Sequence, residues 1–482
     1  MRRLVLLPLL LLFAGVSAVN AQEPWSLLRC VEYARQNGLA VKRAEIAVKT
    51  AALTEQQSRA ERLPSLDGSI NANLRFGRSI NPTTNTFNTE TFGSNSFSLN
   101  SSVVLYSGGR ITNTIEQARV DARAAQADAE VTANDLGLSI ANAYLQILLS
   151  EEQLAAAQKR LEQSQAQLTR MDKLIQAGVR PENERLDLLA SVAREQQTIV
   201  AAQNLVETNY LNLRQLLELD PAAPFRIERP VISIPNDADP FVLQMEAIYQ
   251  QALSSQPQIR AGELRMESAG LGVEIAKSGL LPTVGIGAGL SSNYASIVQD
   301  FNNPNLSNAV LKANDPVNVL INGENATLTT FSVTGVSFPK RPYFDQLSDN
   351  FGYGAGLSIN VPIYNNRRTR TNIDRAELAI LQQQIANKQT MQLLKSDVQR
   401  AVAEAKAAKL SLDAAQSAFN ANQVALENAI KRFELGAINS FDLTTAQNNQ
   451  AAAEVEVIRS RFQYLFNLKV LDFYMGRPIK LD

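Results

Sequence analysis

The side chains that could carry chemistry in this chain of 482 residues are mainly carboxylates and basic groups, because it has no histidine and a single cysteine, Cys30. Histidine or multi-cysteine zinc sites, histidine-held haem, and Ser-His-Asp or Cys-His triads therefore cannot form. The 47 acidic residues nearly balance the 46 basic ones, so no general basic surface is available for nucleic acid. We expect no catalytic site, no cofactor, no bound metal and no nucleic-acid partner.

Two acidic residues share the same spacing from a glycine. Glu184 lies six residues after Gly178, and Asp442 lies six residues after Gly436. Glycine commonly ends a helix, and an acid in the first turn of the next helix is favoured by the helix dipole. A carboxylate enzyme remains a weak alternative, because no pair of acids is recognisable as a general acid and base, and helix surfaces normally carry such charges.

The chain repeats one plan twice. Leu63-Pro64-Ser65-Leu66 returns as Leu281-Pro282-Thr283-Val284, and the segment 104–110 around Tyr106 returns as 362–368 around Tyr364. Beyond these landmarks the spacing is constant, since Gly178 matches Gly436 and Leu213 matches Leu471. Such self-similarity indicates an internal repeat. We expect a signal peptide at 1–21, a first copy at 22–220, a linker at 221–240, and a second copy at 241–482 that contains a long segment at 292–350.

Each copy contains two segments in which apolar and polar residues alternate. They begin near Leu66 and Phe97 in the first copy, and near Val284 and Tyr353 in the second. Alternation places the apolar side chains on one face of a strand, as in a transmembrane barrel and equally in a half-buried soluble sheet. The sequence therefore predicts four strands per chain.

Long helices are predicted between the strand pairs. No proline occurs from Arg110 to Gln176 or from Arg367 to Leu435. Heptad rows run along both segments, with Ile140 to Ile175 in one and Val398 to Phe433 in the other, each beside a row of mostly small residues. This period is typical of left-handed coiled-coil packing. Helical segments at 182–219 and 440–474 complete two helical hairpins, and shorter ones are predicted at 26–62 and 241–279.

The first residues have the pattern of an export signal. Arg2 and Arg3 precede an apolar run from Leu4 to Val16, and small residues surround a predicted cleavage site after Ala21. The run is shorter than the roughly 20 residues of a spanning helix. Export would bring the strands to a membrane, where four strands cannot close a barrel, so the chain must then oligomerise.

Together these landmarks resemble the TolC-type outer-membrane efflux proteins. The resemblance rests on the signal peptide, the two Leu-Pro strand entries, the tyrosines at the strand exits, and the sequence 436–442 after a long alanine-rich helix. It implies a mixed α and β membrane protein, a homotrimer with one twelve-stranded β-barrel that is continuous with a long α-helical barrel. It also implies passive export of solutes through the outer membrane of a Gram-negative bacterium, as part of a tripartite efflux or type I secretion system. The helices would lie in the periplasm and the loop 292–350 outside the cell. The partners would be a periplasmic adaptor protein and an inner-membrane transporter, and no enzymatic activity is expected.

The resemblance implies that the two hairpin tips form a periplasmic gate. Asp442 matches an acidic constriction position, and Glu184 is its counterpart in the first copy. The second constriction aspartate falls on Thr445, which puts a double aspartate ring in doubt, while Asp187 is an acid close by. Three symmetry copies of a carboxylate around a narrow pore would focus a negative potential. The alternative is that Glu184 and Asp442 only complement the helix dipole.

The family also implies docking and anchoring residues. The adaptor would contact the turns Gly178-Val179-Arg180-Pro181 and Gly436-Ala437-Ile438-Asn439, where Arg180 could pair with tip acids or remain solvated. Tyr106 and Tyr364 suit the aromatic belt at a membrane boundary, where they would meet outer-membrane lipid. The competing hypothesis is a trimeric structural or adhesive coiled-coil protein of the envelope, which would not require the tip turns or an open passage.

Overall fold

The computed structural model describes residues 24–80, 85–89, 91–220, 224–230, 240–242 and 244–478. The predicted signal peptide and most of the predicted linker lie outside these residues. The chain forms two compact units, each built from both halves of the sequence. We call residues 24–53, 119–268 and 379–478 the helical unit, and residues 54–118 and 269–378 the strand unit.

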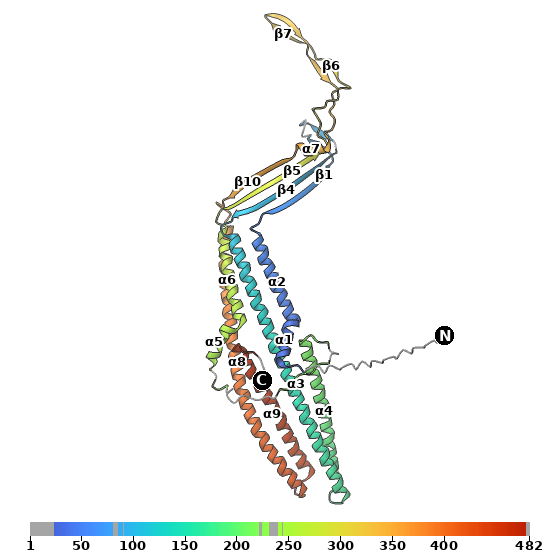
Figure 1. Cartoon of the computed structure of the whole chain (residues 1–482), viewed down its shortest axis with the longest axis vertical. Coiled ribbons are helices and arrows are strands. Elements are labelled where there is room, and N and C mark those ends of the chain that lie inside the picture. The colour runs from blue at the N-terminus through green and yellow to red at the C-terminus, as the bar shows by residue number, and fades with distance from the viewer. Residues whose placement is uncertain are drawn as a thin grey trace, which may run out of the picture. The chain divides into compact units, whose positions relative to one another are not determined.

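The helices confirm the predicted segments to within a few residues. Two helices of 67 residues dominate, α3 (Arg110–Gln176) and α8 (Arg368–Glu434). The others are α1 (Leu27–Asn37), α2 (Leu39–Ala60), α4 (Asn183–Leu216), α5 (Met245–Ser255), α6 (Pro257–Ser278) and α9 (Ser440–Tyr474). Figure 1 shows α3 with α4 and α8 with α9 as two helical hairpins. Among the helices that the structure describes, none combines the length and apolar character needed to cross a membrane.

The two longest helices end in the same way. Gly178 and Gly436 are left-handed, with φ of 71° and 72°. After each glycine the next amide, of Val179 or Ala437, donates to a carbonyl five residues earlier, at 2.9 and 2.8 Å. This is the Schellman cap, which satisfies carbonyls that the helix end leaves free. The two helix ends are therefore equivalent in backbone geometry, as the matched glycines predict.

The core of the helical unit follows the predicted heptad rows. Ile140, Ile147 and Val398 are fully buried, and every position of both rows is buried or half-buried. Around Ile140, α1, α3, α4 and α9 enclose Phe225 and Ile227 of the chain that follows α4. A second cluster joins α5, α6, α8 and α9 around Val398. These rows are thus packing surfaces rather than exposed stripes.

Two chain segments, one at Trp25 and one at Ile227 and Glu228, cross α3 together in the first cluster, and we call them the strap. Trp25 pairs with Ile227 in a parallel bridge. The Tyr144 hydroxyl lies 2.6 Å from the carbonyl oxygen of Glu228 and 3.1 Å from that of Trp25. Burial raises the pKa of the neighbouring Cys30 thiol to about 12. The N-terminal residues and the chain after α4 are therefore held together on α3, around a thiol that stays protonated.

The strand unit contains one antiparallel four-stranded sheet in the order β1 (Ser65–Arg75), β4 (Phe92–Tyr106), β5 (Thr283–Ala295) and β10 (Gly352–Asn360). These are the four predicted strands. The polar face carries hydroxyl pairs such as Ser69–Ser98 at 2.8 Å and Ser65–Ser102 at 3.2 Å. On the other face Leu66, Ile70 and Leu74 are about 70% exposed. The described sheet is open, with β1 and β10 at its edges.

The segments between these strands contain more structure than the alternation predicted. The first holds the short pair β2 (Arg78–Ile80) and β3 (Phe87–Thr89). The second holds β6 (Val310–Ala313), β7 (Val317–Ile321), β8 (Glu324–Leu328), β9 (Phe331–Thr334) and the helix α7 (Tyr343–Asp349). The prediction of four strands per chain therefore applies to the main sheet alone. The additional strands, β2, β3 and β6 to β9, were missed because they are too short to show a long alternating pattern.

The strand-to-helix junctions depend on left-handed residues. Gly108 and Gly109 precede α3, and Asn366 and Arg367 occupy the same places before α8. All four have positive φ, between 54° and 84°. At Gly108 an added Cβ would lie 2.7 Å from Cβ of Leu281 and 2.9 Å from the carbonyl oxygen of Ser278. Only glycine satisfies both the backbone and the space at this position.

Gly108→Val should destabilise the strand unit. A β-branched residue there combines left-handed strain with a backbone clash, for an expected cost of about 2–4 kcal/mol. The measurement is the thermal unfolding midpoint of the purified protein, which should fall. Gly356→Val in β10 is the control, because Gly356 has ordinary φ and open space around it. Equal midpoints for the two variants would contradict this account of the junction.

Candidate functional site

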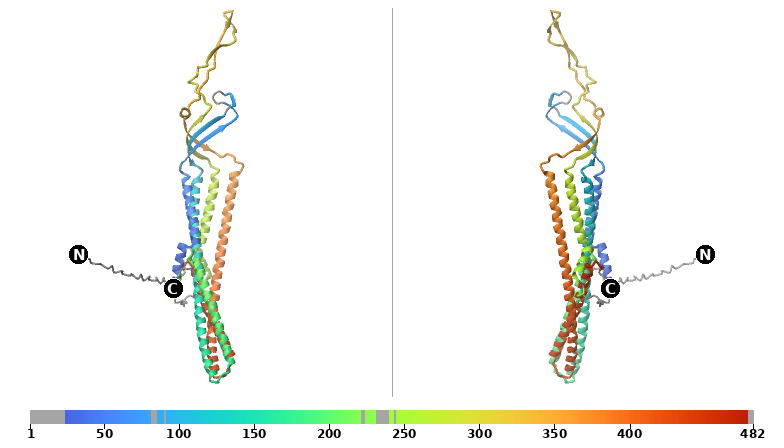
Figure 2. Two further views of the ribbon diagram at one scale, coloured as in Figure 1. Left: turned by 90° about the vertical axis from the view of Figure 1, so that its right-hand side faces the viewer. Right: turned by 90° about the vertical axis from the view of Figure 1, so that its left-hand side faces the viewer.

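The candidate site is formed by the turns that end the two helical hairpins, all within the helical unit. One turn joins α3 to α4 and the other joins α8 to α9. The two hairpin ends lie together in both views of Figure 2. Contacts between them come from residues that are about 250 positions apart in the sequence, so the tip is one structure made from both copies of the predicted repeat.

Arg180 is the main link between the turns. Its Nη2 donates to the carbonyl oxygen of Phe433 at 2.6 Å, and its guanidinium lies 4.8 Å from the centre of the Phe433 ring. Its Nη1 lies 3.4 Å from the Glu184 carboxylate. The side chains of Arg180 and Glu184 are both 14% exposed. Arg180 therefore pairs with a tip acid, which was one of the two predicted possibilities, and also caps the end of α8.

Asp187 makes a second link. Its Oδ2 accepts a hydrogen bond of 2.6 Å from Oγ of Ser440, the first residue of α9. Around this bond Leu188, Leu443 and Ser440 are buried. Arg170 adds an exposed ion pair to Glu434 at 2.6 Å. The predicted acid is thus engaged between the hairpins.

Asp442 and Thr445 lie on one exposed face of α9. Asn439 caps this helix, with Oδ1 accepting from the Asp442 amide at 2.9 Å. The Thr445 hydroxyl donates to the carbonyl oxygen of Phe441 at 2.9 Å. Glu184 and Asp442 both occupy the first turn of their helices, as the dipole interpretation expects. The structure does not join Asp442 and Glu184: one faces solvent and the other is paired with Arg180.

The turns predicted for docking carry exposed apolar side chains. Val179 is 65% exposed, and two neighbours that the sequence analysis did not assign to the docking tips are more exposed still, Leu435 at 84% and Phe441 at 71%. Other missed members of the tip are Phe433, Glu434 and Ser440. Their positions beside the matched glycines were the available signal, but contacts between hairpins cannot be derived from spacing alone.

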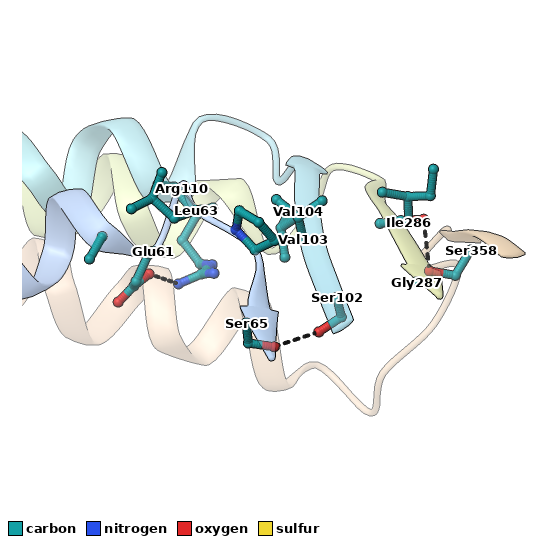
Figure 3. A pocket seen from close by; sticks show the side chains of 14 residues that line it. Glu61, Leu63, Ser65, Ser102, Val103, Val104, Arg110, Ile286, Gly287 and Ser358 are labelled. Atoms are coloured by element: carbon teal, nitrogen blue, oxygen red, sulfur yellow. Dashed lines mark hydrogen bonds and ion pairs between the residues drawn. The ribbon is translucent and has the colours of Figure 1, made fainter. Parts of the chain in front are cut away.

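A separate open pocket of about 660 Å³ lies at the start of the sheet in the strand unit (Figure 3). Its polar groups satisfy one another. Arg110 lies 3.5 Å from the Glu61 carboxylate, and Oγ of Ser358 donates to the carbonyl oxygen of Gly285. Tyr106 ends β4 and is 48% exposed, while Tyr364 follows β10 and is 79% exposed. Within the described residues no cluster of acids or cysteine could hold a metal ion.

Comparisons with known proteins agree on one family. The sequence matches the model of the family described as outer membrane efflux protein over residues 30–218 and 248–477. It is 27% identical over 171 residues to the pyoverdine export outer membrane protein OpmQ of Pseudomonas putida, covering 34% of each chain. It is 22% identical over 212 residues to the outer membrane efflux protein BepC of Brucella suis, covering 44% of this chain and 36% of that one. These alignments thus span about a third of each curated relative.

The fold comparison covers nearly the whole chain. The crystal structure of the outer membrane protein VceC from Vibrio cholerae is similar with a TM-score of 0.70 at 17% identity, over 94% of this chain and 97% of that chain. At this identity the similarity shows the fold. The predicted mixed architecture of long helices and a sheet is therefore confirmed at this level.

Replacing Arg180 should loosen the tip. Arg180→Met removes a half-buried charged hydrogen bond worth about 1.5–3 kcal/mol, so the amides of residues 433–437 should exchange hydrogen at least about tenfold faster. Hydrogen exchange followed by mass spectrometry measures this. Arg170→Met is the control, since its ion pair is exposed and such pairs contribute about 0–1 kcal/mol. The same exchange rates in Arg180→Met as in the unmodified protein would contradict the linking role.

Proposed function

This chain belongs to the outer membrane efflux protein family, and we propose that three copies of it form the outer-membrane duct of an export system. The protein is located in the outer membrane of a Gram-negative bacterium, as the family indicates. In this proposal the duct is passive: a periplasmic adaptor protein and an inner-membrane transporter deliver solutes to it, and the transporter supplies the energy.

The observation that carries the proposal is the open sheet. β1 and β10 each leave one edge without a strand partner in the described chain. One face of the sheet is polar and the other exposes apolar side chains, as a wet lumen and a lipid contact require. Unpaired backbone groups in lipid cost several kcal/mol each. Three copies joined edge to edge would supply twelve strands and leave no edge.

The helices support a tunnel of the same symmetry. Equal lengths of α3 and α8, equal caps at Gly178 and Gly436, and matching left-handed junctions favour an internal two-fold repeat. With such a repeat, three chains present six similar hairpins around one axis. We propose that residues 22–220 and 241–482 are these two copies and that their long helices line the periplasmic part of the duct.

The hairpin tips provide the gate and the docking surface in this proposal. Asp442 is free to project a charge, and Thr445 lies one turn further along the same face. Arg180 and Asp187 hold the hairpins together in a closed arrangement. The exposed Val179, Leu435 and Phe441 offer an apolar contact to the adaptor. Tyr106 and Tyr364 would anchor the strand ends at the membrane boundary.

The duct is favoured over an adhesive coiled coil by the tip itself. Polar links that join two hairpins, beside an exposed acid, suit a pore end that opens and closes. A structural stalk needs none of them. The family is not one of enzymes, and we assign no catalytic role to this chain.

Conductance tests the proposed duct. Purified protein in planar lipid bilayers should give stepwise currents, and the double variant Arg180→Met/Asp187→Asn should give larger steps because the cross-hairpin bonds are gone. The trimer content of both samples is checked by native mass measurement. Trimers of both proteins that conduct no ions would contradict the duct and favour the structural alternative.

Asp442→Lys should change ion selectivity. Reversing three charges at one constriction converts a cation-attracting ring into a repelling one, so the cation-to-anion permeability ratio should fall several-fold and block by divalent cations should weaken. Reversal potentials under a salt gradient measure the ratio. Glu207→Lys reverses an exposed charge on α4, about 36 Å along that helix from its first residue, and should have little effect. Unchanged selectivity in Asp442→Lys would exclude Asp442 from the gate.

A further inference from the structure

The segment between β5 and β10 builds a long two-part hairpin, which we call the ribbon, residues 310–334. β6 pairs with β9, and β7 pairs with β8, both antiparallel. Its tip is Asn322-Gly323, with φ of 53° and 89°. Two successive left-handed residues of this kind form the turn that best fits the twist of a hairpin. The ribbon therefore has regular β-hairpin structure and is not an irregular loop.

Each half of the ribbon has one face that is mainly apolar. In the outer half Glu324 lies on this face, opposite Ile321 at the tip, and Leu320 lies on the other face. The register places Leu311 opposite Val333 and Ala313 opposite Phe331. Further out, Val317 faces Leu328 and Val319 faces Ala326, while the alternate positions include the hydrogen-bonded pair Thr327 and Asn318. Because side chains alternate along a strand, the apolar residues of each pair share a face.

The base of the ribbon is fastened to the strand unit. Gln346 of α7 is buried, with Oε1 accepting from the Ala295 amide at 3.1 Å and Nε2 donating to the carbonyl oxygen of Arg341 at 2.9 Å. Asp300 accepts hydrogen bonds from Asn303 and from Arg341. The ribbon thus emerges from an ordered base beside the outer end of β5.

Within the part of the chain that the structure describes, most of the apolar face has no cover, and only Val319 and Ala326 are half-buried. Exposed fractions there are 70% for Leu311, 64% for Phe331, 58% for Val317, 57% for Val333 and 51% for Leu328. A two-stranded hairpin is marginally stable alone in water. Exposed apolar surface of this kind usually marks an interaction site.

We propose that the apolar face of the ribbon packs against the ribbons of the other two copies in the trimer, so that three ribbons form a collar over the outer end of the duct. This inference rests on the proposed function, because it needs three copies around one axis. The collar would narrow the exit with an apolar contact that the described residues of a single chain do not provide.

Position and length favour another copy as the occupant. The ribbon lies in the segment between β5 and β10, and β10 is the edge strand across which a neighbouring copy would attach. One leg, from Val310 to Ile321, is about 40 Å long at about 3.3 Å per residue. A barrel of twelve strands, about 4.8 Å apart and tilted by about 40°, is roughly 25 Å across. Each ribbon can therefore reach the axis, and the shared barrel keeps the three at a high effective concentration.

Charge argues against a lipid surface as the occupant. The ribbon carries only Lys312, Asp315 and Glu324. Binding to anionic headgroups usually needs several Lys or Arg residues beside the apolar face. Among the paired residues, the apolar face carries one charge, Glu324 at its tip. The rest of the face is uncharged and can pack against identical copies without repulsion between like charges.

Cross-linking between copies tests the collar. Val319→Cys places a thiol on the apolar face, and Asn318→Cys places one on the polar face as a matched control. Cys30 does not react in either variant, because it is fully buried and its thiol remains protonated. In purified trimers a flexible bismaleimide should link Val319→Cys chains at least about fivefold more efficiently than Asn318→Cys chains. A charged maleimide should label Val319→Cys more slowly in trimers than in dissociated chains, because Val319 is half-buried even in a single chain.

The outcomes separate the two proposals. Trimers in which Val319→Cys labels as fast as in dissociated chains and neither cysteine cross-links would overturn the collar and leave the duct standing. Protection of Val319→Cys only in lipid vesicles, without cross-links, would assign the face to lipid and also overturn the collar. Failure to form trimers would overturn both proposals. Ala326→Cys, opposite Val319 on the same face, should reproduce the cross-linking if Val319→Cys folds poorly.

Discussion

The constraint on which the rest of the structure depends is that the backbone groups at the two edges of the main sheet need hydrogen-bond partners. The outward N–H and C=O groups of β1 and β10 have no strand partner within the described chain, and the apolar face beside them exposes leucine and isoleucine side chains. Water can satisfy such edges but lipid cannot. In the proposed duct, the sheet is therefore a fragment that identical neighbours complete, and symmetry decides how they are arranged.

The helical unit shows a related dependence between the two halves of the sequence. Neither hairpin tip is complete alone, since Arg180 of one turn caps the helix that leads to the other and Asp187 binds the start of α9. The strap over Tyr144 joins the N-terminal residues to the chain after α4. Polar contacts of this kind position the long coiled helices, whereas burial of their heptad rows supplies the bulk of the stabilisation.

Much of the fold could be predicted from the sequence because the patterns that mark its main helices and strands extend over many residues. Proline-free heptads gave α3 and α8, and extended alternation gave the four strands of the main sheet. The ribbon strands have four or five residues each, and their alternation was too short to separate from loop sequence, although Asn322-Gly323 is a hairpin signal. At the tip, the glycines and the first-turn acids were predictable from spacing. The bond from Arg180 to the Phe433 carbonyl was not, because it depends on how two hairpins pack across about 250 residues of sequence.

The central claim is that the four-stranded sheet is closed by identical copies. Native mass measurement of the protein, extracted from outer membranes in mild detergent, tests this most directly. The account predicts a stable complex of three chains. A monomer recovered in soluble form from the periplasm would show that the sheet edges meet water instead of neighbouring copies, and it would contradict both the barrel and the duct.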